Sequence, residues 1–194
     1  MPVGPVKNIV LFASGSGSNV ENIARYFKDD PLIHIMAVFT NNKQARVLDR
    51  CNKLNIGTLC FNRTAFYQEE HILRILVALA PDLIVLAGFL WKIPQNLVDT
   101  FPDKIINIHP ALLPKYGGKG MYGVKVHEAV KANKETQTGI TIHFVNANYD
   151  EGAIIHQAIT PVLPTDTAAS IAEKVHQLEY EHFPKVIEKL LSKT

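Results

Sequence analysis

Cysteine is scarce in this chain, and so is net charge. The 194 residues include only two cysteines, Cys51 and Cys60, which are too few and too far apart for a disulfide framework or a Cys-x-x-Cys motif. We therefore expect reduced thiols and a cytoplasmic protein. The formal net charge is only +2 and no run of Lys and Arg occurs, so neither nucleic acid nor a membrane surface is an expected partner.

Long apolar segments and metal-ligand motifs are also missing. No stretch approaches the length needed to cross a bilayer, and the N-terminus lacks the features of a signal peptide. The histidines show no HExxH-like spacing and residues 143–152 do not match a calcium loop, so we expect no metal. The hydrophobic content of 47% and charged content of 20% are ordinary for a globular protein. We expect one domain over residues 1–194.

Short apolar runs alternate with helical patterns in the first 110 residues. The apolar runs predict buried strands, and residues at helical spacing between them predict helices, the first with Ser18 or Asn19 as its N-cap. The expected strands cover residues 8–14, 33–42, 57–62, 83–89 and 104–109, and the expected helices cover 18–30, 45–55 and 65–82. Continuous apolar strands separated by helices predict a mostly parallel sheet with helices on both faces.

The pattern changes after residue 134. Residues 137–147 and 152–162 alternate more strictly and are joined by a short connection, which predicts an antiparallel pair. Residues 167–191 predict a long final helix, with Thr167 as its N-cap and a kink at Pro184. The fold class is therefore α/β, with a mostly parallel sheet and an antiparallel C-terminal part.

A glycine-rich loop, SGSGSN at residues 14–19, joins the first strand to the first helix. Glycines let the backbone approach a ligand closely, and N–H groups at a helix start attract anions. Val20 stands where a dinucleotide fingerprint needs its third glycine, and no GK[ST] motif is present. The loop therefore favours a phosphate monoester, and a plain strand–helix turn is the alternative.

Asn107 and His109 end the strand at 104–109. Side chains alternate along a strand, so these two point the same way, and ligands of open parallel sheets bind beyond the carboxyl ends of the strands. An amide donor beside an imidazole suits stabilisation of an oxyanion together with proton transfer. The pair is therefore a candidate catalytic group, although His109 could instead be a strand-end histidine bonded to the backbone.

The imidazole needs a carboxylate to orient or tune it. Asp150 is the candidate, because the turn before Gly152 could aim it inward, and His143 could be a further partner of that carboxylate. The alternative is that Asp150 only caps a turn. The other histidines considered fit helix or strand surfaces: His127, His156, His176 and His182.

Five segments, in this order, carry a family resemblance: SGSGSN, PDLIVLAGF, INIHPALLPKYGG, GITIHFVNANYDEG and LEYEHFPKVI. Over residues 7–190 the chain resembles the folate-dependent formyltransferase family, and within it the small type that serves purine biosynthesis. The resemblance implies a Rossmann-like formyltransferase fold. It also implies transfer of the formyl group of 10-formyltetrahydrofolate, as co-substrate, to the primary amine of phosphoribosylglycinamide by a monomer or homodimer.

The resemblance further implies roles for individual residues. Asn107 and His109 would polarise the formyl carbonyl and bind the oxyanion, while Asp150 would keep His109 protonated and relay the amine proton through water. The implied ligand contacts are Gly17, Ser18 and Asn19 for the phosphate, Glu179 for the ribose hydroxyls, and Leu90, Trp91, Lys92, Ile93 and Asn107 for the folate.

The chain departs from the family pattern at three places. Trp91 stands where Arg is frequent, Glu151 replaces a glycine, and the loop at 116–129, which we expect to fold over the substrate, is two residues longer. Two other functions stay open: a formyltetrahydrofolate deformylase or another folate-dependent formyltransferase, and a non-catalytic module that binds a phosphometabolite or dinucleotide.

Overall fold

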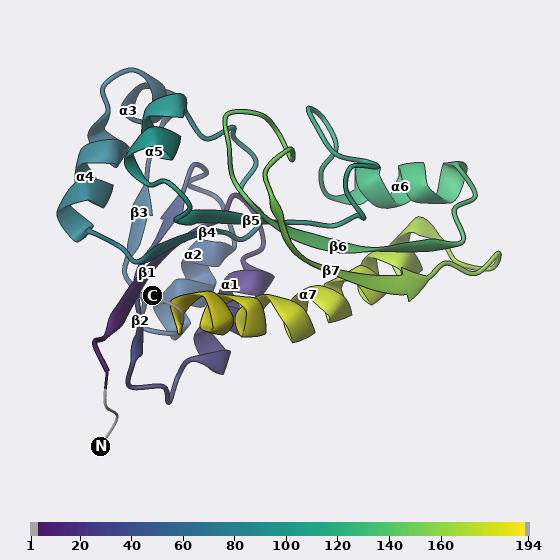
Figure 1. The fold of residues 1–194 in the computed structure, drawn as a ribbon, viewed down its shortest axis with the longest axis horizontal. Coiled ribbons are helices and arrows are strands. Elements are labelled where there is room, and N and C mark those ends of the chain that lie inside the picture. Colours follow the sequence, from purple (N-terminus) through teal and green to yellow (C-terminus); the bar gives the residue numbers. More distant parts are fainter. Residues whose placement is uncertain (1–3, 193–194) are drawn as a thin grey trace.

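A computed structural model describes residues 4–192 of the chain, which form a seven-stranded mixed sheet. The strand order is β3-β2-β1-β4-β5-β6-β7; β1 to β5 pair in parallel, and β6 and β7 are antiparallel. The strands are β1 (Lys7–Phe12), β2 (Ile33–Thr40), β3 (Thr58–Cys60), β4 (Leu83–Leu86), β5 (Ile105–His109), β6 (Gln137–Phe144) and β7 (Ile154–Pro161). The predicted α/β class and the antiparallel C-terminal part are confirmed (Figure 1).

Helices cover both faces of this sheet (Figure 1). They are α1 (Ser18–Tyr26), α2 (Val47–Lys53), α3 (Arg63–Tyr67), α4 (His71–Leu79), α5 (Gln95–Thr100), α6 (Val124–Ala132) and α7 (Ala168–Leu191). Alternate residues of β1 belong to different hydrophobic clusters. Ile9 and Leu11 pack in a cluster with residues of α1, α2, α6 and α7, whereas Val10 and Phe12 pack with residues of α3, α4 and α5. Because both faces are buried, the strand reads as a continuous apolar run.

Two predictions about helices need correction, and two short helices were not predicted. The helix expected at 65–82 is interrupted, because Glu70 has a left-handed backbone (φ 53°) between α3 and α4. The N-cap of α1 is Gly17, with φ 72°, rather than Ser18 or Asn19. The short helices α5 and α6, of 6 and 9 residues, were not predicted because such lengths show little periodicity.

The final helix α7 has the expected N-cap but runs through its proline. Thr167 forms a capping box with Ser170. Pro184 lies inside the 24-residue helix and removes the N–H that would bond the carbonyl four residues earlier. That carbonyl, of Tyr180, instead accepts a hydrogen bond of 2.9 Å from Asn22 Nδ2 of α1. The contact between α1 and α7 thus supplies the hydrogen bond that the Tyr180 carbonyl loses because of Pro184.

The sheet changes its winding direction at β1. After β1 the chain adds β2 and β3 on one side, and then crosses to add β4 and β5 on the other. Ligands bind at such switch points, beyond the carboxyl ends of the strands. The loops after β1 and β4 are joined there, because Ser14 N–H donates to Gly88 O (3.0 Å) and Ser14 Oγ accepts from Leu90 N–H (2.9 Å).

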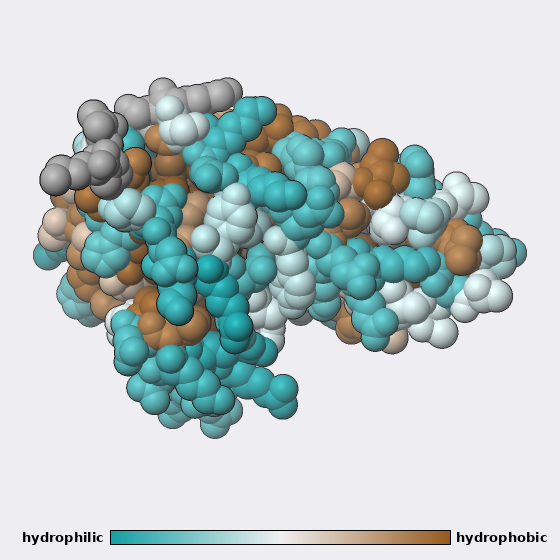
Figure 2. All heavy atoms as spheres, turned by 90° about the horizontal axis from the view of Figure 1, so that it is seen from below, coloured by the Kyte–Doolittle hydropathy of each residue, from teal (hydrophilic) through white to brown (hydrophobic). Residues whose placement is uncertain are grey.

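Hydrophilic residues cover much of the face seen in Figure 2, and the apolar residues on it form separate patches. Within residues 4–192, no helix combines the length and apolar character that crossing a membrane requires.

Candidate active site

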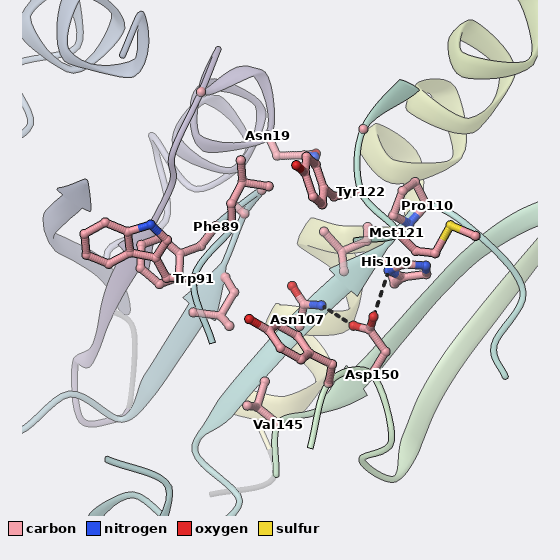
Figure 3. A pocket seen from close by; sticks show the side chains of 18 of the residues that line it. Asn19, Phe89, Trp91, Asn107, His109, Pro110, Met121, Tyr122, Val145 and Asp150 are labelled. Carbon is pink, nitrogen blue, oxygen red and sulfur yellow. Dashed lines mark hydrogen bonds and ion pairs between the residues drawn. The ribbon is translucent and has the colours of Figure 1, made fainter. Parts of the chain in front are cut away.

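A cavity of about 570 Å³ opens at the switch point between β1 and β4. It extends from the glycine loop to the end of β5 and brings together side chains from distant parts of the sequence (Figure 3). All of the predicted site residues line it: Gly17, Ser18, Asn19, Leu90, Trp91, Lys92, Ile93, Asn107, His109, Asp150 and Glu179.

One end of the cavity is formed by the start of α1 and the middle of α7. Asn19 and Glu179 are both buried, at 8% and 6% exposure, and Asn19 Nδ2 donates to Glu179 Oε2 at 3.0 Å. Burial raises the pKa of Glu179, while the hydrogen bond from Asn19 acts in the opposite direction. Asn19 Oδ1 is buried without a hydrogen-bond partner among the described residues. This end therefore offers a free acceptor and a carboxyl group, which suit hydroxyl donors of a ligand.

His109 lies almost fully buried at the end of β5. Its Nε2 is 2.7 Å from the Tyr116 carbonyl oxygen, which can only accept, so Nε2 carries a hydrogen. Its Nδ1 is 3.6 Å from Asp150 Oδ2. Burial lowers the pKa of His109 below 6.5, although the charge of Asp150 and the Tyr116 carbonyl both act to raise it. Burial thus opposes the role expected of Asp150, which is to keep His109 protonated, and that role stays a prediction.

Asp150 lies between Asn107 and His109, and dashed lines mark its contacts with both in Figure 3. Gly118 N–H donates to Oδ2 at 2.9 Å, and Oδ1 lies 3.5 Å from Asn107 Nδ2 and 3.6 Å from His143 Nε2. Burial alone would raise the pKa of Asp150, but the contact with His143 when that ring carries a proton on Nε2, the charge of His109 and the Gly118 N–H together lower it below 3.8. Asp150 is thus a carboxylate at neutral pH, with its oxygens directed toward the two groups predicted to act beside it.

The segment predicted to contact folate forms the rim of the cavity. Leu90 is 49% exposed, whereas Ile93 is buried in the hydrophobic cluster beneath and contributes less surface. Trp91, at the position where the family pattern has Arg, lies under a cation: the guanidinium of Arg63 is 4.7 Å from its ring centroid. Lys92 Nζ is 5.9 Å from the ring of Tyr149 across the opening. The rim therefore combines apolar, aromatic and cationic surface.

Two cavity histidines were missed by sequence reasoning. His127, expected on a surface, is 1% exposed on α6 and lines the cavity, and burial and the neighbouring His176 and His109 lower its pKa to about 4. His127 could not be placed because α6 itself was not predicted. His176 lines the cavity from α7, and its position three residues before Glu179 could have revealed it, since such residues share a helix face.

A glycine loop at a helix start and an imidazole, a carboxamide and a carboxylate around one cavity are features typical of group-transfer enzymes. The chain belongs to the formyl transferase family, which matches residues 7–187. In residues 4–192, no group of three or more His, Cys, Asp or Glu could hold a metal ion.

The most similar relatives carry a more specific name. The chain is 35% identical over 193 residues to "Phosphoribosylglycinamide formyltransferase" of Bacillus subtilis, covering 96% of this chain and 95% of that protein. It is also 35% identical over 187 residues to the chloroplastic enzyme of that name from Arabidopsis thaliana, covering 93% of this chain but only 64% of the plant protein. A crystal structure of phosphoribosylglycinamide formyltransferase from Anaplasma phagocytophilum superposes with a TM-score of 0.84 at 35% identity, covering 94% and 85% of the two chains.

Proposed function

We propose that this chain transfers the formyl group of 10-formyltetrahydrofolate to the primary amine of phosphoribosylglycinamide in purine biosynthesis. The observation that supports this most directly is the continuous cavity. It joins a glycine loop at a helix start, suited to a phosphate, with Asn107, His109 and Asp150, suited to acyl transfer. The names of the relatives agree with formyl transfer to phosphoribosylglycinamide.

The reaction would proceed by direct attack of the amine nitrogen on the formyl carbon. The carbonyl electron pair moves to oxygen, where Asn107 and His109 stabilise it as an oxyanion. Asp150, a carboxylate in the free protein, accepts the proton of the attacking amine through water and passes it to the leaving folate nitrogen as the carbon–nitrogen bond breaks. His109 stabilises the oxyanion as an imidazolium, whose second N–H is free to donate, and the charge of Asp150 and the Tyr116 carbonyl favour that protonated form.

The two substrates would occupy opposite ends of the cavity. Gly17, Ser18 and Asn19 hold the phosphate, and Glu179 accepts hydrogen bonds from the ribose hydroxyls beside the unpartnered Asn19 Oδ1. The run from Leu90 to Ile93 borders the folate, together with Asn107. Folate acts as a co-substrate. We place the activity in the cytoplasm, which agrees with two free cysteines, one of them exposed.

An absorbance assay tests the proposal. The purified chain is mixed with phosphoribosylglycinamide and a formyl-folate analogue, and release of the deformylated folate is followed over time. We expect release only when both substrates are present. Release without the amine would identify a hydrolase, in which water replaces the amine, and no release with both substrates would identify a binding module.

A further inference from the structure

His143 faces the candidate catalytic group from the neighbouring strand. It lies on β6 directly opposite Asn107 of β5 and is 2% exposed. Its Nδ1 is 2.8 Å from the carbonyl oxygen of Phe144. Because a carbonyl can only accept, Nδ1 carries the hydrogen, and the Nε2 of the neutral ring is left as an acceptor.

This tautomer dictates how the carboxamide of Asn107 is turned. His143 Nε2 lies 3.1 Å from Asn107 Nδ2, and Asp150 Oδ1 lies 3.5 Å from the same nitrogen. Both neighbours are acceptors, so the side of the amide that faces them must be the NH₂ group. Reversing the amide would place its oxygen against two lone pairs and leave buried acceptors unpaired, which is unfavourable.

The two hydrogen bonds of Asn107 differ in length. The bond to His143 has an ordinary length, whereas the contact to Asp150 is at the outer limit. One Nδ2 hydrogen is therefore anchored, and the other is loosely held next to Asp150, on the side where the reacting carbonyl is expected. Asp150 and His109 are the titratable groups that face His143, from the loop after β6 and from β5.

We propose that His143 is a positioning residue for formyl transfer: as the Nδ1–H tautomer, it anchors the Asn107 carboxamide so that its second N–H is presented to the formyl oxygen. The expected effect on turnover rests on the proposed function. His143 is too buried to contact substrate extensively, so it acts through Asn107.

Two matched substitutions test the anchoring. The amide of Gln can place an oxygen near the position of Nε2, while the shorter Asn can replace only the Nδ1 contact. We expect His143→Gln to keep most of the turnover and His143→Asn to lower kcat by roughly 10–100-fold, a fraction of the loss for a missing oxyanion donor. The Michaelis constants of both substrates should stay within about twofold.

A double-mutant cycle then separates positioning from a general structural effect. If His143 acts through Asn107, adding His143→Asn to Asn107→Ala should cost less than about twofold beyond Asn107→Ala alone. Equal losses in the two backgrounds, or wild-type kcat for His143→Asn, would overturn the proposal.

The tautomer itself can be read in the unsubstituted protein without any activity. Nitrogen-15 NMR of the His143 ring at neutral pH should show a protonated Nδ1 and an unprotonated Nε2. An Nε2–H tautomer would overturn the proposal even if all variants fail to fold. A chain that shows the expected tautomer but transfers no formyl group would instead contradict the proposed function.

Discussion

Asp150 shows how a few contacts decide the charge of a buried side chain. The side chain is only 11% exposed, and burial by itself would favour the neutral acid. The Gly118 N–H and the polar groups around the carboxylate reverse this and keep it ionised. The carboxylate in turn opposes the effect of burial on His109. The two groups therefore have pKa values that depend on each other.

Replacing Asp150 should change the titration of His109 in a defined direction. Because the charge of Asp150 raises the pKa of His109, Asp150→Asn should lower that pKa further, so that the ring stays neutral to a more acidic pH. Histidine titration followed by NMR measures this, with His34→Gln, on the exposed surface of β2, as the control. The same variant should lose turnover much more than it loses affinity for either substrate. An unchanged His109 pKa would show that the two side chains do not interact.

Removing the imidazole tests the other half of the pair. His109→Ala should reduce turnover by roughly two to four orders of magnitude, because it deletes both an oxyanion donor and a proton carrier. Steady-state kinetics with His34→Ala as the control checks this. Turnover close to that of the unsubstituted protein would remove His109 from the mechanism.

The glycine loop links the first strand, α1 and α2. Gly17 has φ 72°, and a Cβ at this position would lie 2.8 Å from the backbone Cα of Val47 in α2. At Gly15, by contrast, an added Cβ would meet no atom within 4 Å. The loop thus contains one glycine that the packing of α2 requires and one that it does not.

This difference predicts that alanine at Gly17 lowers the stability of the protein, whereas alanine at Gly15 leaves it nearly unchanged. Gly17→Ala combines an unfavourable left-handed conformation with a backbone clash, and should destabilise the protein by about 2–4 kcal/mol. It should also raise the Michaelis constant for the phosphorylated substrate. Gly15→Ala should stay within about 0.5 kcal/mol of the unsubstituted protein. Urea unfolding measures both, and equal stabilities would mean that the close approach of α2 to the loop is absent.

At the scale of elements, the sequence was most informative where hydrophobic periodicity is strong. The strands β2, β4 and β5, the antiparallel pair and the capped helix α7 fall within the predicted ranges, and β1 begins one residue before its range. The break at Glu70 was not predictable, because the apolar spacing on both sides of it is compatible with one helix. The hydrogen bond from Asn22 to the Tyr180 carbonyl joins residues 158 positions apart. It depends on how α1 packs against α7, and no local sequence pattern predicts that packing.

At the scale of the whole molecule, strand alternation and the tendency of ligands to bind beyond the carboxyl ends of parallel strands correctly placed Asn107 and His109 together in the lining of a cavity. The sequence could not give the protonation of His109, because that depends on the amount of burial around the ring. Nor could it give the pairing of His143 with Asn107, which follows from the β5–β6 register. Burial of His127 likewise depends on the packing of α6 against α7 and the cavity wall. The sequence therefore predicted which side chains would meet in the cavity, but not how strongly burial would affect their protonation.

The burial of His127 makes global stability depend on pH. Its pKa is about 4 in the folded protein and near 6.5 when unfolded. At neutral pH both states hold the neutral ring, and the group has no effect on the pH dependence. As the pH falls below 6.5 the unfolded state binds a proton that the folded state does not, so stability decreases until the pH passes the folded pKa near 4.

His127→Gln, which cannot titrate, should remove this part of the acid sensitivity. Between pH 6.5 and 4 the unfolding free energy of the unsubstituted protein should fall by roughly 1–2 kcal/mol more than that of the variant, after allowance for solvent screening at the cavity wall. Urea unfolding at a series of pH values measures the difference, and His34→Gln should follow the unsubstituted protein. Because His109 and His156, whose pKa values are also lowered, are present in all three proteins, their contributions largely cancel in the comparison. Parallel curves for His127→Gln and the unsubstituted protein would mean that His127 takes up its proton as readily in the fold as in the unfolded chain, and hence that its ring is solvated within the cavity.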